Sequence, residues 1–536
     1  LISLTKSNFV DIKTTSGTVR GHTISVFNHT VNEFLAIPYA KPPVGELRFD
    51  KPKPIDKPLK TIINATVQGY ACMQPKLFNT YTNNVSEDCL VLNIWAPVVS
   101  SGVQFSTNTK TIKPVMVWFY GGGFIGGSIF MLPLHNGSIL ATNDMVIVTV
   151  NYRLDVFGFL YTNDPSAPGN VGIYDQQLAL KWVKHNIHKF GGNSNQITIF
   201  GQSVGSWSVS LHILSPLSKG LFHRGIMQSG AQLFSKKIQM VTKNDALRDT
   251  LELAKHFNCG NDSKQRLKCL RQLDANVLFS FRNYSTKNLF HWNAIYDTHI
   301  FPHTAQVAFR KRLFNKDIQL LAGDTTLEGS ELAYNGYPIL HTNNVTKDVF
   351  IDLVKITKYF FHSVNINKIT DYYLSNVDLN NSSAVRQAFF QYFGDVGITC
   401  PTYLFAKTFA EKAPKHSNVY LYQWNYGKSD GALGQIIGVS HQYDVPFVFG
   451  VPLVSKKFLS KTFNEEDKKF SLYIMKVWTD FAKYGKPDLS NKWSPINNIK
   501  DYNLKVKDFD PLIDSPILNY NPFNKICDKF WKNYYF

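Results

Sequence analysis

The sequence predicts an α/β fold in which helices cover both faces of a large, mostly parallel sheet. Short runs of continuously apolar residues alternate with stretches of helical periodicity, and no Pro- or Gly-rich linker or charge block divides the 536 residues. Continuous apolar runs are typical of strands buried on both faces, and their alternation with helices is typical of parallel sheets. Length alone would allow three or four domains, but we expect one domain over residues 1–536.

Six apolar runs are the expected strands: Val115–Tyr120, Met145–Val150, Ile197–Phe200, Gly225–Gln228, Gln319–Ala322 and Val419–Trp424. Helical spacing predicts helices at Tyr174–Phe190, Val204–Leu214 and Glu466–Tyr484, the last with an apolar stripe that we expect to pack in the core. Because ligands of such sheets bind beyond the carboxyl ends of the strands, the chemistry is expected there.

The net charge of +18 invites a nucleic-acid or membrane hypothesis. However, 46 of the 57 basic residues are scattered lysines, and no run of five or six like charges occurs. We interpret this as a solvated surface and expect no nucleic-acid partner. No apolar run approaches the roughly 18–20 residues that span a bilayer, so we expect no membrane anchor.

The six cysteines form neither a C-x-x-C pair nor a Cys/His cluster with metal-ligand spacing, which argues against a metal site. Their even number suits three disulfides in an oxidising compartment. Acceptor motifs for N-glycosylation occur at Asn28, Asn64, Asn84, Asn136, Asn261, Asn283, Asn344, Asn380 and Asn381. The chain begins with Leu1 rather than Met, as expected after removal of a signal peptide. We expect a secreted or lumenal protein, either monomer or homodimer, whose final compartment could be vesicular or lysosomal.

The strongest motif is Gly201-Gln202-Ser203-Val204-Gly205, a G-x-S-x-G pattern. It follows an expected strand and opens an expected helix, which is the setting of a nucleophile elbow. The sharp turn raises the serine hydroxyl above the sheet. Glycines are needed at both ends because side chains there would collide with the neighbouring strand and helix.

A second glycine-rich segment, Tyr120–Phe124, follows another expected strand. Its glycines allow backbone N–H groups to point inward and stabilise an oxyanion. We expect Gly122 and Gly123 to supply two such donors, and the N–H of Val204 to supply a third.

Further segments match a known family in order along nearly the whole chain: Ala36–Phe49, Ser86–Asn93, Gly121–Phe124, Asn151–Arg153, Ala167–Gly172, Asp175-Gln176, Phe200–Gly205, Glu328–Ser330 and Phe447–Gly450. The sequence thus resembles the type-B carboxylesterases, of the carboxylesterase/cholinesterase family with the α/β-hydrolase fold. The resemblance implies a serine esterase that needs no cofactor and acts on a small-molecule ester.

The order of the catalytic residues in such proteins is serine, acid, histidine. Spacing alone leaves Asp324 or Glu328 as the acid, and the histidine could be His341, His362, His416 or His441. The family's Glu-Gly-Ser step indicates Glu328, which makes Asp324 a loop or surface carboxylate, and the family's pattern around the histidine matches only His441.

The resemblance also implies contacts in the scaffold. It implies the disulfides Cys72–Cys89, Cys259–Cys269 and Cys400–Cys527, the ion pairs Arg48–Glu87 and Arg153–Asp175, and Ser229 as a partner of the acid.

Two departures from the family concern the substrate. Residues 72–89 lack the tryptophan that binds the cationic group in cholinesterases, and Gln202 replaces the glutamate that usually precedes the serine. These departures favour neutral esters over choline esters. We expect Phe290 and Trp292 to line the acyl side of the pocket. The alternatives are a non-catalytic member that serves in adhesion or storage, or a peptidase or lipase that uses the same triad.

Overall fold

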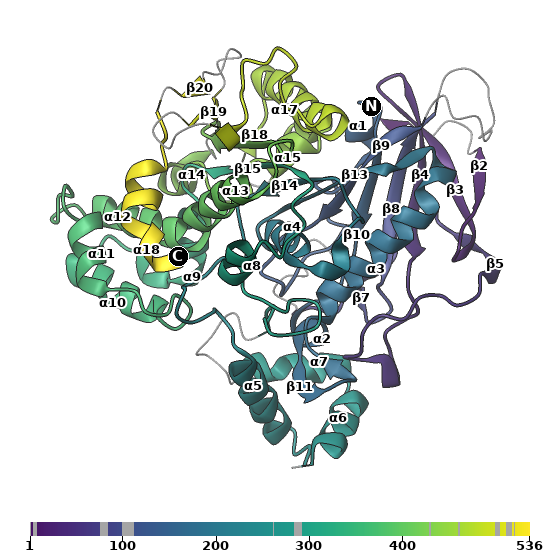
Figure 1. Cartoon of the computed structure of the whole chain (residues 1–536), viewed down its shortest axis with the longest axis horizontal. Coiled ribbons are helices and arrows are strands. Elements are labelled where there is room, and N and C mark those ends of the chain that lie inside the picture. The colour runs from purple at the N-terminus through teal and green to yellow at the C-terminus, as the bar shows by residue number, and fades with distance from the viewer. Residues whose placement is uncertain are drawn as a thin grey trace.

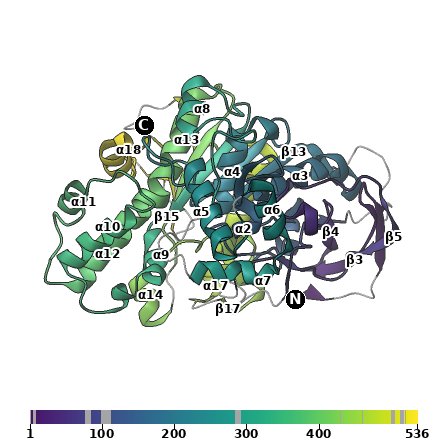
Figure 2. The same cartoon turned by 90° about the horizontal axis from the view of Figure 1, so that it is seen from below.

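The computed structural model describes residues 2–3, 8–75, 84–98, 112–260, 262–283, 292–427, 430–458, 461–498, 504–510, 517–518 and 520–536. A large twisted sheet crosses the molecule, and helices lie on both sides of it (Figures 1 and 2). Among the described residues, no helix combines the length and the apolar character needed to cross a membrane.

The described part of the sheet has 14 strands. Twelve of them form the path β1 (Ile2–Ser3), β3 (Gly17–Val26), β4 (His29–Pro38), β8 (Val91–Pro97), β10 (Val146–Val150), β9 (Lys113–Phe119), β13 (Gly192–Gln202), β14 (Arg224–Gln228), β15 (Gln319–Thr325), β16 (Val419–Trp424), β19 (Val506–Phe509) and β20 (Ile517–Leu518). Two further strands, β2 (Phe9–Lys13) and β5 (Leu59–Asn64), pair with β3.

Along this path the sheet is parallel from β10 to β19 and antiparallel at both ends, while off the path β5 pairs with β3 in parallel. All six expected strands lie in the parallel part, so the predicted α/β fold class is confirmed. The chain enters this sheet near its start and returns to it at β20, and we therefore propose that it folds as one domain.

The three expected helices are α3 (Val171–Asn186), α4 (Val204–Leu214) and α17 (Glu465–Tyr484). The stretch expected to continue helix α3 tightens into a 3₁₀ turn at Ile187–Phe190. Asn464 caps α17 through a reciprocal bond with Asp467, and Gly485 ends the helix in the left-handed conformation. The apolar stripe of α17 is buried, as predicted.

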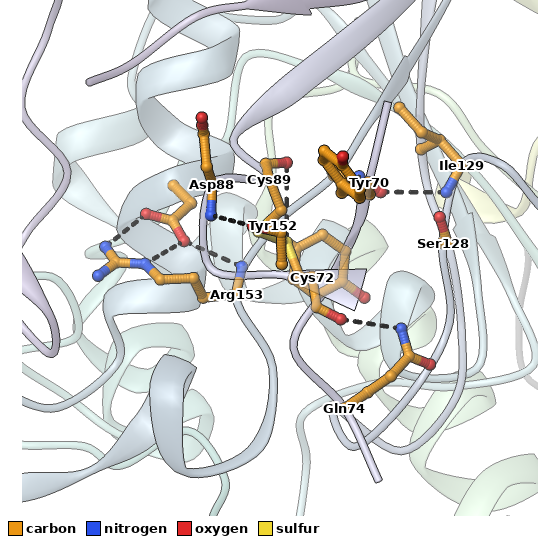
Figure 3. The surroundings of a disulfide bond; sticks show 12 residues. Tyr70, Cys72, Gln74, Asp88, Cys89, Ser128, Ile129, Tyr152 and Arg153 are labelled. Carbon is orange, nitrogen blue, oxygen red and sulfur yellow. Dashed lines mark hydrogen bonds and ion pairs between the residues drawn. A yellow bond between two sulfur atoms is a disulfide. The ribbon is translucent and has the colours of Figure 1, made fainter. Parts of the chain in front are cut away.

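All three expected disulfides are present. Figure 3 shows the first, Cys72–Cys89, with the Gln74 amide directed at the Cys72 carbonyl. The same amide donates to Gly127 O and accepts from Gly127 N, both at 3.0 Å. The disulfide segment is thereby attached to the loop that contains Gly122 and Gly123.

The two expected ion pairs are also present. Arg48 binds both carboxylate oxygens of Glu87, at 2.7 and 2.5 Å. Arg153 binds both oxygens of Asp175, at 2.8 and 2.7 Å, and is fixed in this position beside the disulfide (Figure 3). Such bidentate pairs orient the backbone segments that carry them, and the pair of Arg153 with Asp175 is buried on both sides.

Candidate active site

Ser203 lies between the last residue of β13 and the first residue of α4. Its φ of 60° and ψ of −127° are strained for a residue with a side chain, and such strain is typical of functional turns. Ser203 is partly exposed, whereas the residues on both sides of it are buried.

The glycines of this turn are required sterically. A Cβ on Gly205 would lie 2.0 Å from the Phe119 carbonyl oxygen of β9, and one on Gly201 would lie 2.5 Å from the Gly205 backbone. The predicted collisions with the neighbouring strand and helix are therefore confirmed. Only glycine allows β13, β9 and α4 to approach one another this closely around Ser203.

The glycine loop, residues 121–127, lies beside this turn. A Cβ on Gly121 would come within 2.9 Å of the Ser203 Cβ, so the two backbones are in contact. Gly122 and Gly123 have φ values of 114° and 68°, and neither amide donates a hydrogen bond to any residue that the structure describes. The Val204 N–H, at the first position of α4, has no intrahelical acceptor. These amides are available to an external anion.

Glu328 and His441 lie 113 residues apart in sequence and are in direct contact. The His441 Nδ1 lies 2.5 Å from Glu328 Oε2, while the other Glu328 oxygen accepts from the Thr325 N–H at 2.6 Å. Glu328 is the residue that precedes α9 (Gly329–Gly336), and His441 lies between α14 (Gly431–Ile437) and α15 (Val445–Val448). Both side chains are buried. The carboxylate thus fixes the orientation of the imidazole.

The second imidazole nitrogen of His441 is bonded to Gln202, the residue before Ser203. The distance from Gln202 Nε2 to His441 Nε2 is 3.1 Å. Within the described chain, the Ser203 Oγ makes no hydrogen bond. That Gln202 carries no charge is read directly from the sequence, but its contact with His441, 239 residues away, is not encoded in any local motif.

Several acids act on the charge of His441. Burial alone would lower its pKa, but the charge and hydrogen bond of Glu328, with the charges of Glu331 and Asp444, raise the pKa above 6.5. Burial raises the pKa of Glu331, which accepts a hydrogen bond from Ser440 Oγ. Burial likewise raises the pKa of Asp444 to about 6, against a hydrogen bond from Gln228.

The prediction that Asp324 is a loop or surface carboxylate is wrong. It lies in β15 and is 1% exposed, and neither of its oxygens has a hydrogen-bond partner in the described chain. Burial and the nearby charges of Glu328 and Asp395 hold its pKa well above the usual range. The predicted strand ends at Ala322 and leaves Asp324 in a loop, whereas β15 continues to Thr325.

Three other expected site residues have different outcomes. Ser229 is buried at the end of β14, and its Oγ makes no hydrogen bond in the described chain, so its role as a partner of the acid stays a prediction. Trp292 is buried, and its place in the acyl pocket is likewise a prediction. Phe290 lies outside the described residues.

A cavity of about 310 Å³ opens beside His441. Most of its walls are apolar or aromatic, and its polar lining comes from Glu331, Asn335, Ser440, His441, Gln442 and Lys461. The Lys461 ammonium is paired with Asp467 at 3.1 Å and lies over the rings of Tyr426 and Tyr443. A chamber of this size and lining could receive one part of a small organic substrate.

Comparison with known proteins gives the same family as the motifs. The carboxylesterase family model matches residues 6–512. The chain is 36% identical to a cholinesterase of Mus musculus, covering 91% of this chain and 80% of that protein. It is 35% identical to an acetylcholinesterase of Danio rerio, with 89% and 80% covered, and 32% identical to one of Bungarus fasciatus, with 98% and 86% covered. The chain therefore belongs to the carboxylesterase family and is a carboxylic ester hydrolase of the serine esterase type.

Proposed function

We propose that this enzyme cleaves esters through Ser203 as nucleophile, His441 as general base and Glu328 as the acid that orients His441. The observation that carries the proposal is the Glu328–His441 contact, joined by Gln202 to the strained turn at Ser203. These contacts support the arrangement of an activated serine, in which a nucleophile stands at a sharp turn, a base lies near it and a carboxylate lies behind the base.

In the first half of the reaction, Ser203 Oγ attacks the ester carbonyl carbon while its proton moves to His441 Nε2. The oxyanion that forms is held by the N–H groups of Gly122, Gly123 and Val204, each worth roughly 3 kcal/mol where such donors have been removed. The imidazolium, stabilised by Glu328, then protonates the leaving alkoxide as its bond to carbon breaks. The alcohol departs and the acyl group stays on Ser203.

In the second half, His441 removes a proton from water, which attacks the acyl carbonyl. The second tetrahedral intermediate collapses, Ser203 recovers its proton from His441, and the carboxylic acid leaves. The reaction balances without a cofactor, and each step uses groups in the segments that follow the carboxyl ends of the parallel strands β9, β13, β15 and β16.

Hydrolysis of p-nitrophenyl butyrate tests this assignment. We expect Ser203→Ala to lower kcat by about 10⁴- to 10⁶-fold, since the members of such a triad act as a unit. Ser440→Ala, which removes another serine beside His441, should retain most of the activity. An organophosphate should label the wild-type enzyme on the Ser203 peptide. Full activity of Ser203→Ala would overturn the nucleophile, and an inactive but folded wild-type protein would favour the adhesion or storage role.

We further propose that the alcohol part of the substrate is neutral. Gln202 places an uncharged amide where a carboxylate would attract a cation, and residues 72–89 contain no tryptophan. The test compares acetylthiocholine with its uncharged analogue 3,3-dimethylbutyl thioacetate. We expect kcat/KM for the neutral ester to equal or exceed that for the choline ester.

A second candidate is hydrolysis of cationic esters. Glu331 supports it, because this carboxylate lines the cavity beside His441, and relatives of the chain are named for choline esters. A preference of tenfold or more for acetylthiocholine that disappears in Glu331→Gln would establish this candidate in place of the neutral one.

The disulfides bear on the compartment in which the enzyme works. Three disulfides favour an oxidising compartment, and we propose that the protein is secreted or lies in the lumen of vesicles or lysosomes. We also propose that it is a monomer or homodimer without a nucleic-acid partner.

The described glycosylation motifs are accessible: Asn136 is half-buried, and six are exposed, namely Asn28, Asn64, Asn84, Asn344, Asn380 and Asn381. Asn261 and the side chain of Asn283 lie outside the described residues. We propose that glycans attach at the exposed sites, and mass spectrometry of the secreted protein tests this.

A further inference from the structure

The contact between Gln202 and His441 uses the atom on which the proposed mechanism depends. The Glu328 carboxylate only accepts hydrogen bonds, so His441 Nδ1 carries the proton in the 2.5 Å contact between them. In the neutral imidazole, Nε2 then has one lone pair and no hydrogen. The Gln202 Nε2 at 3.1 Å therefore donates its N–H to that lone pair.

The same lone pair must accept the Ser203 proton during attack. A single lone pair accepts one well-directed hydrogen bond, so the Gln202 amide and the Ser203 hydroxyl compete for it. In the described structure the amide holds it, and Ser203 Oγ has no partner. We propose that Gln202 is a reversible cap on the general base, which occupies His441 Nε2 in the resting enzyme and releases it for each attack by Ser203.

The scaffold positions the cap. Gln202 ends β13, where it is paired with β14 through Gln228, and its side chain is 3% exposed. The amide fits because residue 121 has no side chain: a Cβ there would lie 2.8 Å from Gln202 Oε1. Backbone pairing and this local space direct the amide to the imidazole, so Gln202 is a positioning residue rather than a reacting one.

The cap has a distinctive electrostatic consequence. The Gln202 N–H that donates to His441 Nε2 stabilises the neutral imidazole. Once Nε2 is protonated, its own N–H points at the Gln202 N–H, and the two donors repel each other. The contact therefore lowers the pKa of His441. It therefore opposes the acids that face His441, which are Glu328 and Glu331 at α9 and Asp444 before α15. The other titratable groups lining the neighbouring cavity are Lys461, Tyr334 and Tyr443. None of these other residues is substituted in a Gln202 variant.

The cap rests on the proposed function of Ser203 and His441. Gln202→Met tests the cap, because methionine keeps the length of the side chain but has no N–H. We expect kcat/KM on the alkaline plateau to rise about two- to tenfold, because the free energy of one neutral hydrogen bond corresponds to a factor of about that size. The acidic limb of kcat/KM should move to higher pH by about 0.5 to 1. Gln202→Glu should move the limb further upward, since a carboxylate accepts from the imidazolium.

Gln176→Met is the matched control. Gln176 is also a buried glutamine bonded to a histidine, His212 Nε2 at 3.1 Å, but this pair lies outside the proposed triad. Its loss should affect stability and leave the pH profile unchanged. A Gln202→Met profile that stays in place or moves to lower pH, or a lower plateau rate, would overturn the cap.

A second measurement does not require activity. In protein labelled with ¹⁵N-histidine, the His441 signal is identified by its loss in His441→Asn, and its titration is followed directly. We expect the His441 pKa to be higher in Gln202→Met than in wild type. If the wild-type protein hydrolyses no ester, the proposed function is wrong, but the titration still shows whether the Gln202 amide is bonded to His441. An unchanged His441 pKa in an active enzyme rejects the cap alone.

Discussion

At the scale of single residues, the charge of one carboxylate next to the base should set the working pH of the enzyme. Glu331 lines the cavity beside His441, and its charge is one of those that raise the His441 pKa. A base with a raised pKa stays protonated, and therefore inactive, up to a higher pH. Activity is thus lost as pH falls through the raised His441 pKa, which lies above 6.5.

We expect Glu331→Gln to move the acidic limb of kcat/KM to lower pH by a few tenths of a unit, because it removes a negative charge that favours the imidazolium. The measurement is kcat/KM for a neutral ester between pH 5 and 9. Glu465→Gln, which neutralises an exposed glutamate on α17, serves as the control and should leave the limb in place. A shift to higher pH in Glu331→Gln would contradict this account of the His441 environment.

At the scale of elements, the loop that carries the proposed oxyanion donors depends on a side chain from another segment. The Gln74 amide makes three hydrogen bonds, one to the Cys72 carbonyl and two to the Gly127 backbone. The cross-linked segment at Cys72 therefore supports the far end of the loop whose Gly122 and Gly123 amides have no partner among the described residues. The donors of an oxyanion hole must be fixed before the reaction, since their value comes from preorganisation.

Gln74→Ala should consequently lower kcat about 10- to 100-fold with a smaller change in KM, because the donors act on the transition state. Hydrogen exchange of the amides of residues 122–127 should become faster in the same variant. Gln177→Ala, which removes another buried glutamine amide from α3, provides the comparison. A fall in kcat with unchanged exchange in the loop would show that Gln74 acts in some other way.

The strands of the sheet differ in how far the sequence predicts them. Strands β9, β10 and β13–β16 are buried on both faces, so their apolar runs are continuous and were found. Strands β3 and β4 alternate between buried and less buried residues, and their polar positions hide them. The triad candidates follow from motif and order, but the Gln202 contact and the burial of Asp324 depend on how distant segments pack, which no local pattern encodes.

At the scale of the whole molecule, buried carboxyl groups near the site should make the protein less stable as pH rises. Burial raises the pKa of Asp395 to about 7 and that of Asp444 to about 6, and the pKa of Asp324 is also raised well above its usual range. In the unfolded chain such groups titrate near 3.9. Between the two pKa values the unfolded chain has lost a proton that the native state keeps, so increasing pH favours unfolding.

Asp324 offers the clearest test, because both of its oxygens lack a partner in the described chain and the neutral acid resembles an amide in shape. Asp324→Asn cannot titrate, so its advantage over wild type should grow by up to about 1.4 kcal/mol for each pH unit above the unfolded pKa. For a chain of this length, the gain between pH 4.5 and 6.5 corresponds to roughly 2–3 °C in Tm by calorimetry. Asp371→Asn, at an exposed position on α11 (Ile366–Tyr373), should show no such trend. A constant or shrinking difference for Asp324→Asn would mean that Asp324 is ionised in the native enzyme, and Glu328 would then have a second negative charge beside it.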